Sequence, residues 1–250
     1  MLLDSFKLGS ELAANSWGLP VRPTMDNYVR LLNYNAGTMI KSYMNGVFIS
    51  TSYTLLTIMV SSLAAYSFSK YTFKGKKTLF FLLLSTMMVP TEIALPPLYI
   101  MFSKMHWLNT FQVQIIPGIA SVFVMFMLKQ YIDGLPTSLI ESARIDGAGH
   151  LMVFSRIMLP LASPAIGAMT ILTFLGKWND YLWPIIMLTK PKYMPIMVLL
   201  PTLSDRNNIF TVPWELVLTG CTIVTLPLIG VFLVFQDKFM SSVTMGAVKE

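Results

Sequence analysis

The stretch from Glu141 to Pro164, "ESARIDGAGHLMVFSRIMLPLASP", decides how this chain is interpreted. It contains two acidic residues, two arginines, a histidine, two glycines and two prolines, and long apolar segments lie on both sides of it. Glycine and proline are the strongest local signals for turns. A polar segment with such turn signals, placed between apolar runs, predicts a structured loop at one surface of a membrane.

The composition also favours a membrane protein. Hydrophobic residues make up 54% of the 250 residues, charged residues only 12%, and the mean hydropathy is +0.63. A soluble domain carries about 25% charged residues, so the long uncharged runs indicate several membrane helices. The net charge of +6 fits Lys and Arg in cytoplasmic loops better than a nucleic-acid partner. With one cysteine, Cys221, and two distant histidines, His106 and His150, we expect neither an internal disulfide nor a metal site.

Five apolar segments are long enough to cross a bilayer, which takes roughly 20 residues each. Because the lipid interior offers no hydrogen bonds to the backbone, these segments should be helices, and a β-barrel would show shorter alternating segments. The fold class predicted is therefore an all-α, polytopic helical bundle. The expected spans cover residues 43–68, 79–101, 107–128, 157–188 and 216–235.

The chain divides into three parts on this pattern. Residues 1–42 form a polar, turn-rich N-terminal segment, residues 43–236 hold the apolar segments, and residues 237–250 form a tail. Residues 133–163, which include the quoted stretch, form a loop within the central part.

Prolines lie well inside four of the expected helices, where they remove a backbone hydrogen bond and bend the helix. Bent membrane helices often line a cavity, although a kink can also serve packing alone. Glu92 lies in "VPTEIALPP", where an acid either faces protein and water or lies at the outer rim of the membrane. Both interpretations stay open. The prolines are Pro90, Pro96, Pro97, Pro117, Pro184 and Pro227.

Charge predicts the topology. "SKYTFKGKK" places four lysines between the first two spans, and short basic loops beside helix ends stay cytoplasmic. Alternation then puts residues 133–163 and the C-terminal tail inside, and residues 104–106 and 190–213 outside. It also puts residues 1–42 outside, although no helix or signal precedes them in this sequence. We therefore expect a first membrane helix to be missing upstream.

The quoted stretch itself predicts two short helices joined by a turn. Ser138 followed by Glu141 fits a capping box, and Asp146-Gly147 ends the first helix because glycine tolerates a left-handed turn. The second helix starts near His150, with Leu151, Phe154 and Met158 on one face. Two interpretations remain open: a surface that docks onto a partner, or a helix lying in the lipid interface.

The same residues resemble the EAA motif found in membrane subunits of bacterial ABC importers. The family pattern is Glu-Ala-Ala, three residues, Gly, nine residues, then Ile-x-Leu-Pro. Ser142 departs from it, because alanine is common there. The residues that match at the family's spacing are Glu141, Ala143, Gly147, Ile157, Leu159 and Pro160.

Other stretches resemble one branch of that family, the carbohydrate importers of the maltose-transporter type. They are "LAAYSFSKYTFKGK", "MMVPTEIALPPLYIMF", "KWNDYLWPIIML" and "TMGAVK", and together the resemblance runs from about Asn45 to the end. It implies the smaller permease subunit of such a system, with the type I importer fold. That fold has six membrane helices in this branch, of which five are visible here. It also implies a multi-pass location in the bacterial cytoplasmic membrane.

The resemblance further implies a mechanism in which the EAA segment couples to a separate ATPase. Glu141 would contact or match the charge of the ATPase cleft, Gly147 would permit the turn, and Leu151, Met152 and Phe154 would supply apolar contact. Ser142, Ala143, Asp146 and Pro160 complete the expected coupling set. The sequence has no Gly-x-x-x-x-Gly-Lys-Ser/Thr loop, so we expect ATP and Mg on the partner and no cofactor on this chain.

The expected partners are a second permease subunit, two copies of the ATPase subunit, an extracytoplasmic sugar-binding protein and the lipid bilayer. The outer loop with "SDRNNIF" would meet the binding protein by resemblance. Tail residues Gly246, Ala247 and Lys249 would approach the ATPase dimer.

The translocation path is expected near "KWNDYLWP". Asn179, Trp183 and Ile186 are spaced i, i+4 and i+7, so on one helix they would share a face. Aromatic rings flanked by amides and carboxylates suit sugars, which have an apolar face and a polar rim. An aromatic belt at the outer membrane surface is the alternative.

Two other classes of protein, a membrane enzyme and a secondary transporter, fit the sequence less well. A membrane enzyme would need paired acids or a Ser/His set, and Glu92 and Asp180 form no recognisable pair, so a non-catalytic subunit is predicted. A secondary transporter working alone would need ion-coupling acids at mid-membrane.

Overall fold

The structure is a computed structural model that describes residues 1–15, 17–34, 37–204 and 212–247, with only the backbone described for residues 238–247. Every regular element in these ranges is helical, which confirms the predicted all-α fold. In chain order the elements are η1 (Asp4–Phe6), α1 (Gly9–Ala14), α2 (Asp26–Leu32), α3 (Thr38–Lys70), α4 (Lys76–Thr86), η2 (Thr91–Ala94), α5 (Leu95–Lys104), α6 (Phe111–Ile115), α7 (Val122–Asp133), α8 (Ser138–Ile145), α9 (His150–Val153), the π-helical turn η3 (Phe154–Met158), α10 (Leu159–Leu161), α11 (Ser163–Trp178), α12 (Leu182–Met187), η4 (Pro191–Tyr193), α13 (Ile196–Leu199), η5 (Leu200–Leu203) and α14 (Trp214–Ala247).

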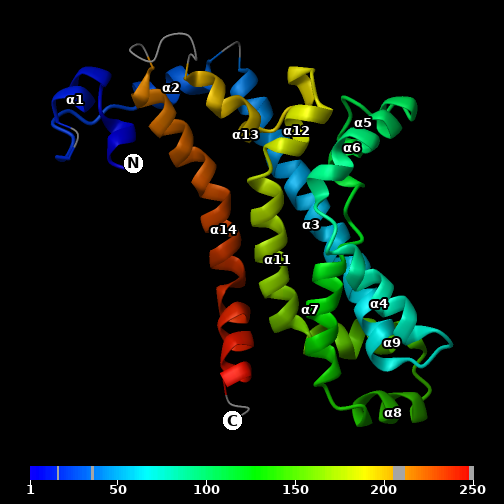
Figure 1. Ribbon diagram of the computed structural model, residues 1–250. Helices are drawn as coiled ribbons and strands as arrows, with labels where there is room; N and C mark the ends of the chain where they lie inside the picture. Colours follow the sequence, from blue (N-terminus) through cyan, green and yellow to red (C-terminus); the bar gives the residue numbers. More distant parts are fainter. Residues whose placement is uncertain (16, 35–36, 205–211, 248–250) are drawn as a thin grey trace.

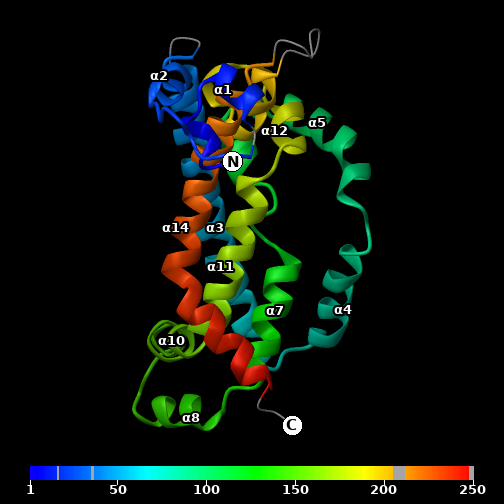
Figure 2. The same ribbon diagram turned by 90° about the vertical axis from the view of Figure 1, so that its left-hand side faces the viewer.

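Helices α3, α7, α11 and α14 form a bundle, and α4 and α5 lie to one side of it (Figures 1 and 2). Small side chains on one face of α3 allow close packing. Ser50, Thr54, Thr57, Ser61 and Ala65 recur every three or four residues, and all are buried. Small residues at such spacing let helix backbones approach closely in membranes, and this explains the extensive contact of α3 with α7 and α11.

Trp178 joins α11 to α3 and α14. It is 2% exposed, stacks on Phe174 with ring centroids 5.9 Å apart, and donates a hydrogen bond from Nε1 to the Val224 carbonyl at 3.1 Å. A Cβ added at Gly46 of α3 would lie only 3.1 Å from the Trp178 ring. The absence of a side chain at Gly46 therefore makes room for this indole.

Among the described residues, α3 and residues 214–237 of α14 are long and apolar enough to cross a membrane. Two bent pairs also qualify if each is counted as one span, which gives up to four. The first pair is α4 with η2–α5, bent by 85°, and the second is residues 150–161 with α11, bent by 78°. The kink expected near Pro90 in the second span is thus present.

The third expected span, residues 107–128, differs from the prediction of one continuous helix. It consists of α6, an irregular link and α7. The link contains Pro117 and Gly118, and Gly118 has a φ of +87°. Proline cannot donate the backbone hydrogen bond of a helix and Gly118 is left-handed, so the helix breaks between α6 and α7.

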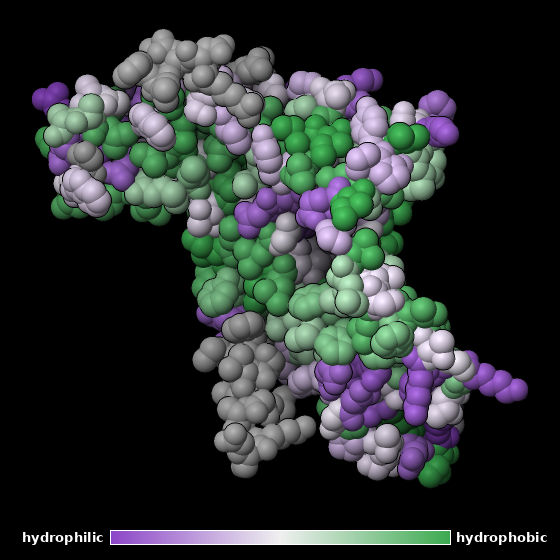
Figure 3. Space-filling view, in the orientation of Figure 1, coloured by the Kyte–Doolittle hydropathy of each residue, from purple (hydrophilic) through white to green (hydrophobic). Residues whose placement is uncertain are grey.

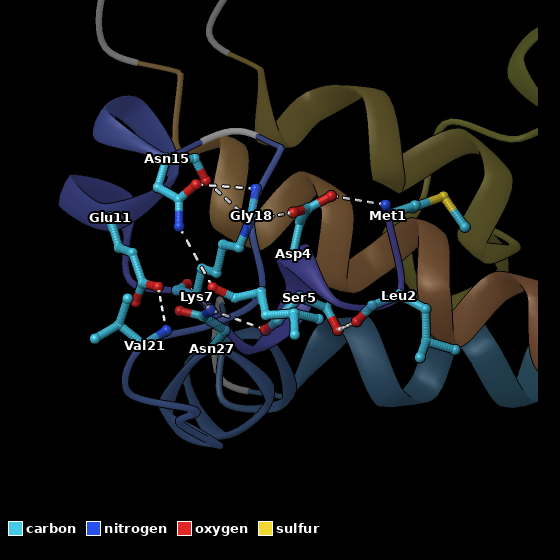
Figure 4. A network of polar contacts seen from close by, with 11 residues as sticks. Met1, Leu2, Asp4, Ser5, Lys7, Glu11, Asn15, Gly18, Val21 and Asn27 are labelled. Atoms are coloured by element: carbon cyan, nitrogen blue, oxygen red, sulfur yellow. Dashed lines mark hydrogen bonds and ion pairs between the residues drawn. The ribbon is translucent and has the colours of Figure 1, made fainter.

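The N-terminal segment is folded against α14 rather than extended. Figure 4 shows its polar network, in which Lys7 is fully buried. The Lys7 ammonium lies 2.8 Å from Asp4 Oδ1 and donates to the Asn15 carbonyl at 2.9 Å. Asn27 Nδ2 donates to the carbonyls of Ser5 and Lys7 at 3.0 and 2.7 Å, which joins η1 to α2.

Candidate functional site: an exposed helical loop and a polar cavity

The loop predicted from the quoted stretch consists of α8, a turn and α9, at the far end of the molecule from α1 and α2 (Figures 1 and 2). The predicted capping box of Ser138 and Glu141 is wrong. Ser138 is already the first helical residue, and Thr137 takes the N-cap position without a side-chain hydrogen bond. Glu141 lies in the first turn of α8, where a carboxylate interacts favourably with the helix dipole.

The turn after α8 has the predicted geometry. Gly147 has a φ of +81°, and the amide of Ala148 donates to the Ala143 carbonyl at 2.9 Å. These are features of the glycine-ended helix terminus, in which a left-handed residue lets the chain reverse. The second helix then begins at His150, as expected.

Most of the predicted coupling residues lie on the surface of this loop. Leu151 is 75% exposed and Met152 47% exposed, and Ala143 is half-buried. Ile145, which sequence analysis did not select, is 87% exposed at the end of α8. The other exposed members of the predicted set are Glu141, Ser142, Asp146, Gly147 and Pro160.

Phe154 lies in the interior instead. It is 8% exposed and packs on Tyr66 of α3, with ring centroids 5.5 Å apart. The predicted face of Leu151, Phe154 and Met158 is therefore wrong, because Leu151 is exposed while the other two are buried. A π-helical turn runs from Phe154 to Met158, and the residues at both of its ends are buried, whereas Leu151 lies before it in the short α9.

A cluster of four side chains ties the loop to the end of α3. Tyr71 follows α3, and its hydroxyl oxygen lies 2.5 Å from Nδ1 of His150. The Arg144 guanidinium lies 5.5 Å from the centre of the Tyr71 ring, and its Nη2 lies 3.2 Å from the same nitrogen of His150. Tyr66 completes the cluster, with its ring 5.4 Å from that of Tyr71. Sequence analysis missed this cluster because its members come from separate segments.

A second attachment joins α3 to the start of the loop. The Lys70 ammonium donates to the Leu135 carbonyl at 2.7 Å. Close by, Lys129 and Asp133 form an ion pair in the last turn of α7. Burial raises the pKa of Asp133, but its hydrogen bond from Lys129 and the nearby ammonium charges outweigh burial and hold that pKa below its usual range. Both ends of the loop are thus anchored to the bundle.

A cavity of about 590 Å³ opens where three helix breaks meet. The breaks are the link between α4 and α5, the link between α6 and α7, and the link between α11 and α12. Figure 3 shows hydrophilic residues at mid-height, with hydrophobic residues around them, on a face that is also hydrophilic at its lower right. The polar and aromatic residues of the lining are Tyr53, Thr57, Thr91, Glu92, Ser121, Phe123, Thr173, Lys177, Asp180 and Trp183.

The last turn of α11 and the link to α12 supply the charged side chains on one wall of the cavity, Lys177 and Asp180. Asp180 Oδ2 lies 3.0 Å from the Lys177 ammonium, and Asp180 Oδ1 accepts a hydrogen bond from the Trp183 amide at 3.3 Å. Trp183 is fixed in turn, because its Nε1 donates to the Val113 carbonyl at 2.9 Å.

Comparison with known proteins identifies the family. Residues 46–244 match the family described as the binding-protein-dependent transport system inner membrane component. The chain belongs to this family. The permease is 36% identical to the arabinooligosaccharides transport system permease protein AraQ of Bacillus subtilis, over all of this chain and 88% of that protein. It is 30% identical to the trehalose/maltose transport system permease protein MalG of Thermococcus litoralis, over 91% of this chain and 82% of that protein.

A solved structure has the same fold as the permease. It is the crystal structure of a bacterial ABC transporter involved in the import of the acidic polysaccharide alginate. The TM-score is 0.82 at 23% sequence identity, over 95% of this chain and 88% of that one. The expected importer fold is therefore confirmed.

The three predicted pathway residues of the permease do not share one helical face. Helix α11 ends at Trp178 and α12 begins at Leu182, so Asn179 lies outside both. Of the three, only Trp183 lines the cavity. Asn179 donates back to the Leu175 carbonyl at 3.0 Å, and Ile186 packs in an apolar cluster with Phe102 and Met187.

Two other predicted contact regions of the permease are described only in part. The loop predicted to lie outside begins with η4, α13 and η5, but residues 205–210 of "SDRNNIF" lie outside the described residues. Gly246 and Ala247 belong to the backbone of α14, and Lys249 lies outside the described residues.

Proposed function

We propose that this permease forms half of the path by which a sugar or oligosaccharide enters a bacterial cell. The path would be driven by a separate ATPase subunit that docks on the α8–α9 loop. The names of its relatives AraQ and MalG support a carbohydrate as the transported solute. The permease would work with a second permease subunit, two ATPase subunits and an extracytoplasmic sugar-binding protein. Its C-terminus would lie in the cytoplasm, and the ATPase would hold ATP and Mg.

The observation that carries this proposal is the chemistry of the exposed loop. Ile145 and Leu151 project apolar side chains on either side of the Gly147 turn, next to exposed Glu141. Isolated exposed apolar residues are common, but a cluster rimmed by charge is typical of a protein interface. Phe154 supports the loop from within and is not part of the docking surface.

The attachment of the loop to α3 supports transmission of movement. Tyr71 contacts both Arg144 of α8 and His150 of α9, and Lys70 holds the chain just before α8. A force applied to the loop would therefore reach α3, which lines the cavity through Tyr53 and Thr57. Packed helices and hydrogen-bonded contacts of this kind are the physical means by which distant sites are coupled.

Reconstitution tests this function. The permease, its sister subunit, the ATPase subunit and the binding protein are placed in proteoliposomes, and labelled maltose and arabinotriose are offered with and without ATP. We expect uptake that requires both ATP and the ATPase subunit. Gradient-driven uptake by the permease alone would instead identify a secondary transporter and overturn the proposal.

A further inference from the structure

The charges of the cavity point to the class of solute that it admits. Its lining contains two acids, Glu92 and Asp180, and one base, Lys177, which leaves one net negative charge among the described lining residues. An ionisable side chain at membrane depth generally marks a substrate or ion pathway. The sign of each charge, and whether it is already paired within the protein, then determine which solutes the cavity attracts.

The basic residue among the described lining residues, Lys177, already has its partners within the protein. The Lys177 ammonium pairs with Asp180 at 3.0 Å and lies 5.2 Å from the centre of the Tyr53 ring. Its side chain is only 9% exposed. Lys177 therefore has its acceptors within the protein, and an incoming carboxylate would have to displace Asp180 from it.

Glu92 is the lining carboxylate that forms no ion pair among the described residues. It lies on η2, between α4 and α5, and the ion pairs of the described residues do not include it. The hydrogen bond recorded for its carboxylate comes from the neighbouring Thr91 hydroxyl at 3.3 Å. Glu92 is exposed, and a cavity lined by an unpaired charge lowers the local concentration of solutes of the same sign, so Glu92 disfavours an anionic solute.

The rest of the lining suits a neutral solute with many hydroxyl groups. Exposed Thr91 and half-buried Ser121 contribute hydroxyl groups to the lining. Trp183 and Tyr53 present aromatic rings that are held in place by hydrogen bonds to the carbonyls of Val113 and Gly118. A carboxylate, hydroxyl groups and fixed rings can each contact a pyranose or furanose.

We propose that this cavity admits neutral, hydroxyl-rich oligosaccharides and disfavours acidic ones, and that Glu92 sets this preference. The proposal rests on the proposed function and names its substrate class. It contrasts the permease with the solved importer of the same fold, which imports the acidic polysaccharide alginate.

Thiol chemistry tests the charge of the cavity without any knowledge of the sugar. In a Cys221→Ser background, Gly176→Cys places a thiol in the cavity lining, where an added Cβ meets no atom within 4 Å. The rates of modification by a cationic, a neutral and an anionic methanethiosulfonate reagent are measured on the purified complex. We expect the cationic reagent to react about tenfold faster than the anionic one, because a charged cleft concentrates ions of opposite sign.

Glu92 is then replaced by Gln and by Lys in the same Gly176→Cys protein. We expect the ratio of cationic to anionic rates to fall towards one with Glu92→Gln and to invert with Glu92→Lys. Ser103→Cys is the control, because Ser103 is exposed near the end of α5 and outside the cavity. Its ratio should not respond to Glu92, since 11 residues of mostly helical chain span roughly 16 Å, more than a Debye length of about 8 Å.

Protection by sugars completes the test. Arabinotriose or maltose should slow the neutral reagent at Gly176→Cys, and trigalacturonate should not. An anionic reagent that reacts as fast as the cationic one, ratios that ignore Glu92, a thiol at position 176 that never reacts, or protection by trigalacturonate alone would each overturn the inference. ATP-driven uptake, measured on the same complex after reconstitution in proteoliposomes, separates this result from the proposed function, which fails if ATP drives no sugar uptake.

Discussion

The hydroxyl oxygen of Tyr71 lies 2.5 Å from Nδ1 of His150, although the two residues are 79 positions apart in the chain. Tyr71 follows the last residue of α3, and His150 is the first residue of α9. This contact joins the exposed loop to α3, which lines the cavity through Tyr53 and Thr57. It is therefore a direct physical connection between the proposed docking surface and the proposed path.

Removing this hydroxyl should weaken coupling without unfolding the permease. Tyr71→Phe keeps the ring beside Arg144 but removes the hydrogen bond to His150, which is worth about 1 kcal/mol. We expect the number of sugar molecules transported per ATP hydrolysed to fall about fivefold, and Tyr71→Ala to lower it further.

Tyr99→Phe is the matched control, because Tyr99 is exposed on α5, outside the loop. Both quantities are measured in proteoliposomes. An unchanged ratio of transport to hydrolysis in Tyr71→Phe, or an equal loss in Tyr99→Phe, would remove this contact from the coupling route.

The turn between α8 and α9 should depend on Gly147 and not on Gly149. A side chain at the left-handed Gly147 costs about 1–2 kcal/mol, whereas Gly149 has a φ of −71° and open space around it. We expect Gly147→Ala to lower transport several-fold, Gly147→Asp to abolish it and uncouple ATP hydrolysis, and Gly149→Ala to leave it near normal.

Membrane insertion and assembly with the sister subunit are measured for all three variants. Equal effects of alanine at both glycines would contradict the role assigned to the turn.

Trp178 should matter for stability. Trp178→Phe removes the hydrogen bond to Val224 and leaves a void beside Gly46, so we expect a loss of about 1–3 kcal/mol. The measurement is the apparent melting temperature of the purified permease, which should fall by several degrees. Trp214→Phe serves as control, because Trp214 is 55% exposed at the start of α14. A larger shift for Trp214→Phe would show that α11 and α14 are not held together in this way.

The lowered pKa of Asp133 predicts that the stability of the permease depends on pH. Its pKa in the folded protein lies below the ordinary value of 3.8, because its hydrogen bond from Lys129 and the nearby ammonium charges outweigh burial. A carboxyl whose pKa is lowered on folding contributes stability above its unfolded pKa, and this is lost as the pH falls through the folded pKa. Asp133→Asn should therefore lower the melting temperature at pH 6, and its difference from the unchanged protein should shrink below about pH 4. A difference in melting temperature between the two proteins that grows as the pH falls would contradict this role of Asp133.

Sequence patterns predicted the features that depend on local chemistry. Length and hydropathy located α3 and α14, and Gly147 and the start of α9 at His150 followed from turn rules. The break at Pro117-Gly118 could have been read from the same rules, since proline followed by glycine marks a turn. It was missed because the apolar run around it is long enough for a span.

Other features left a weak local signal or none. The interval between α11 and α12 contains neither glycine nor proline, so Asn179, Trp183 and Ile186 were expected on one helix. The weak signal there was Asp180, which accepts from the Trp183 amide, as aspartate does at helix starts. The burial of Phe154 follows from its packing on Tyr66, which is far away in the sequence. Glu92 was noted as an unusual acid, and only the fold brings it into one cavity with Lys177 and Asp180.

The most direct test of the central claim is crosslinking from the α8–α9 loop in native membranes. A photoreactive amino acid is placed at Ile145, which is 87% exposed, and, as control, at Tyr99 of α5. We predict an adduct at Ile145 with a polypeptide that carries a phosphate-binding loop and binds ATP, identified by mass spectrometry, and no such adduct at Tyr99. Adducts at Ile145 with lipid alone, in membranes that contain the assembled transporter, would contradict the claim that this loop receives the ATPase.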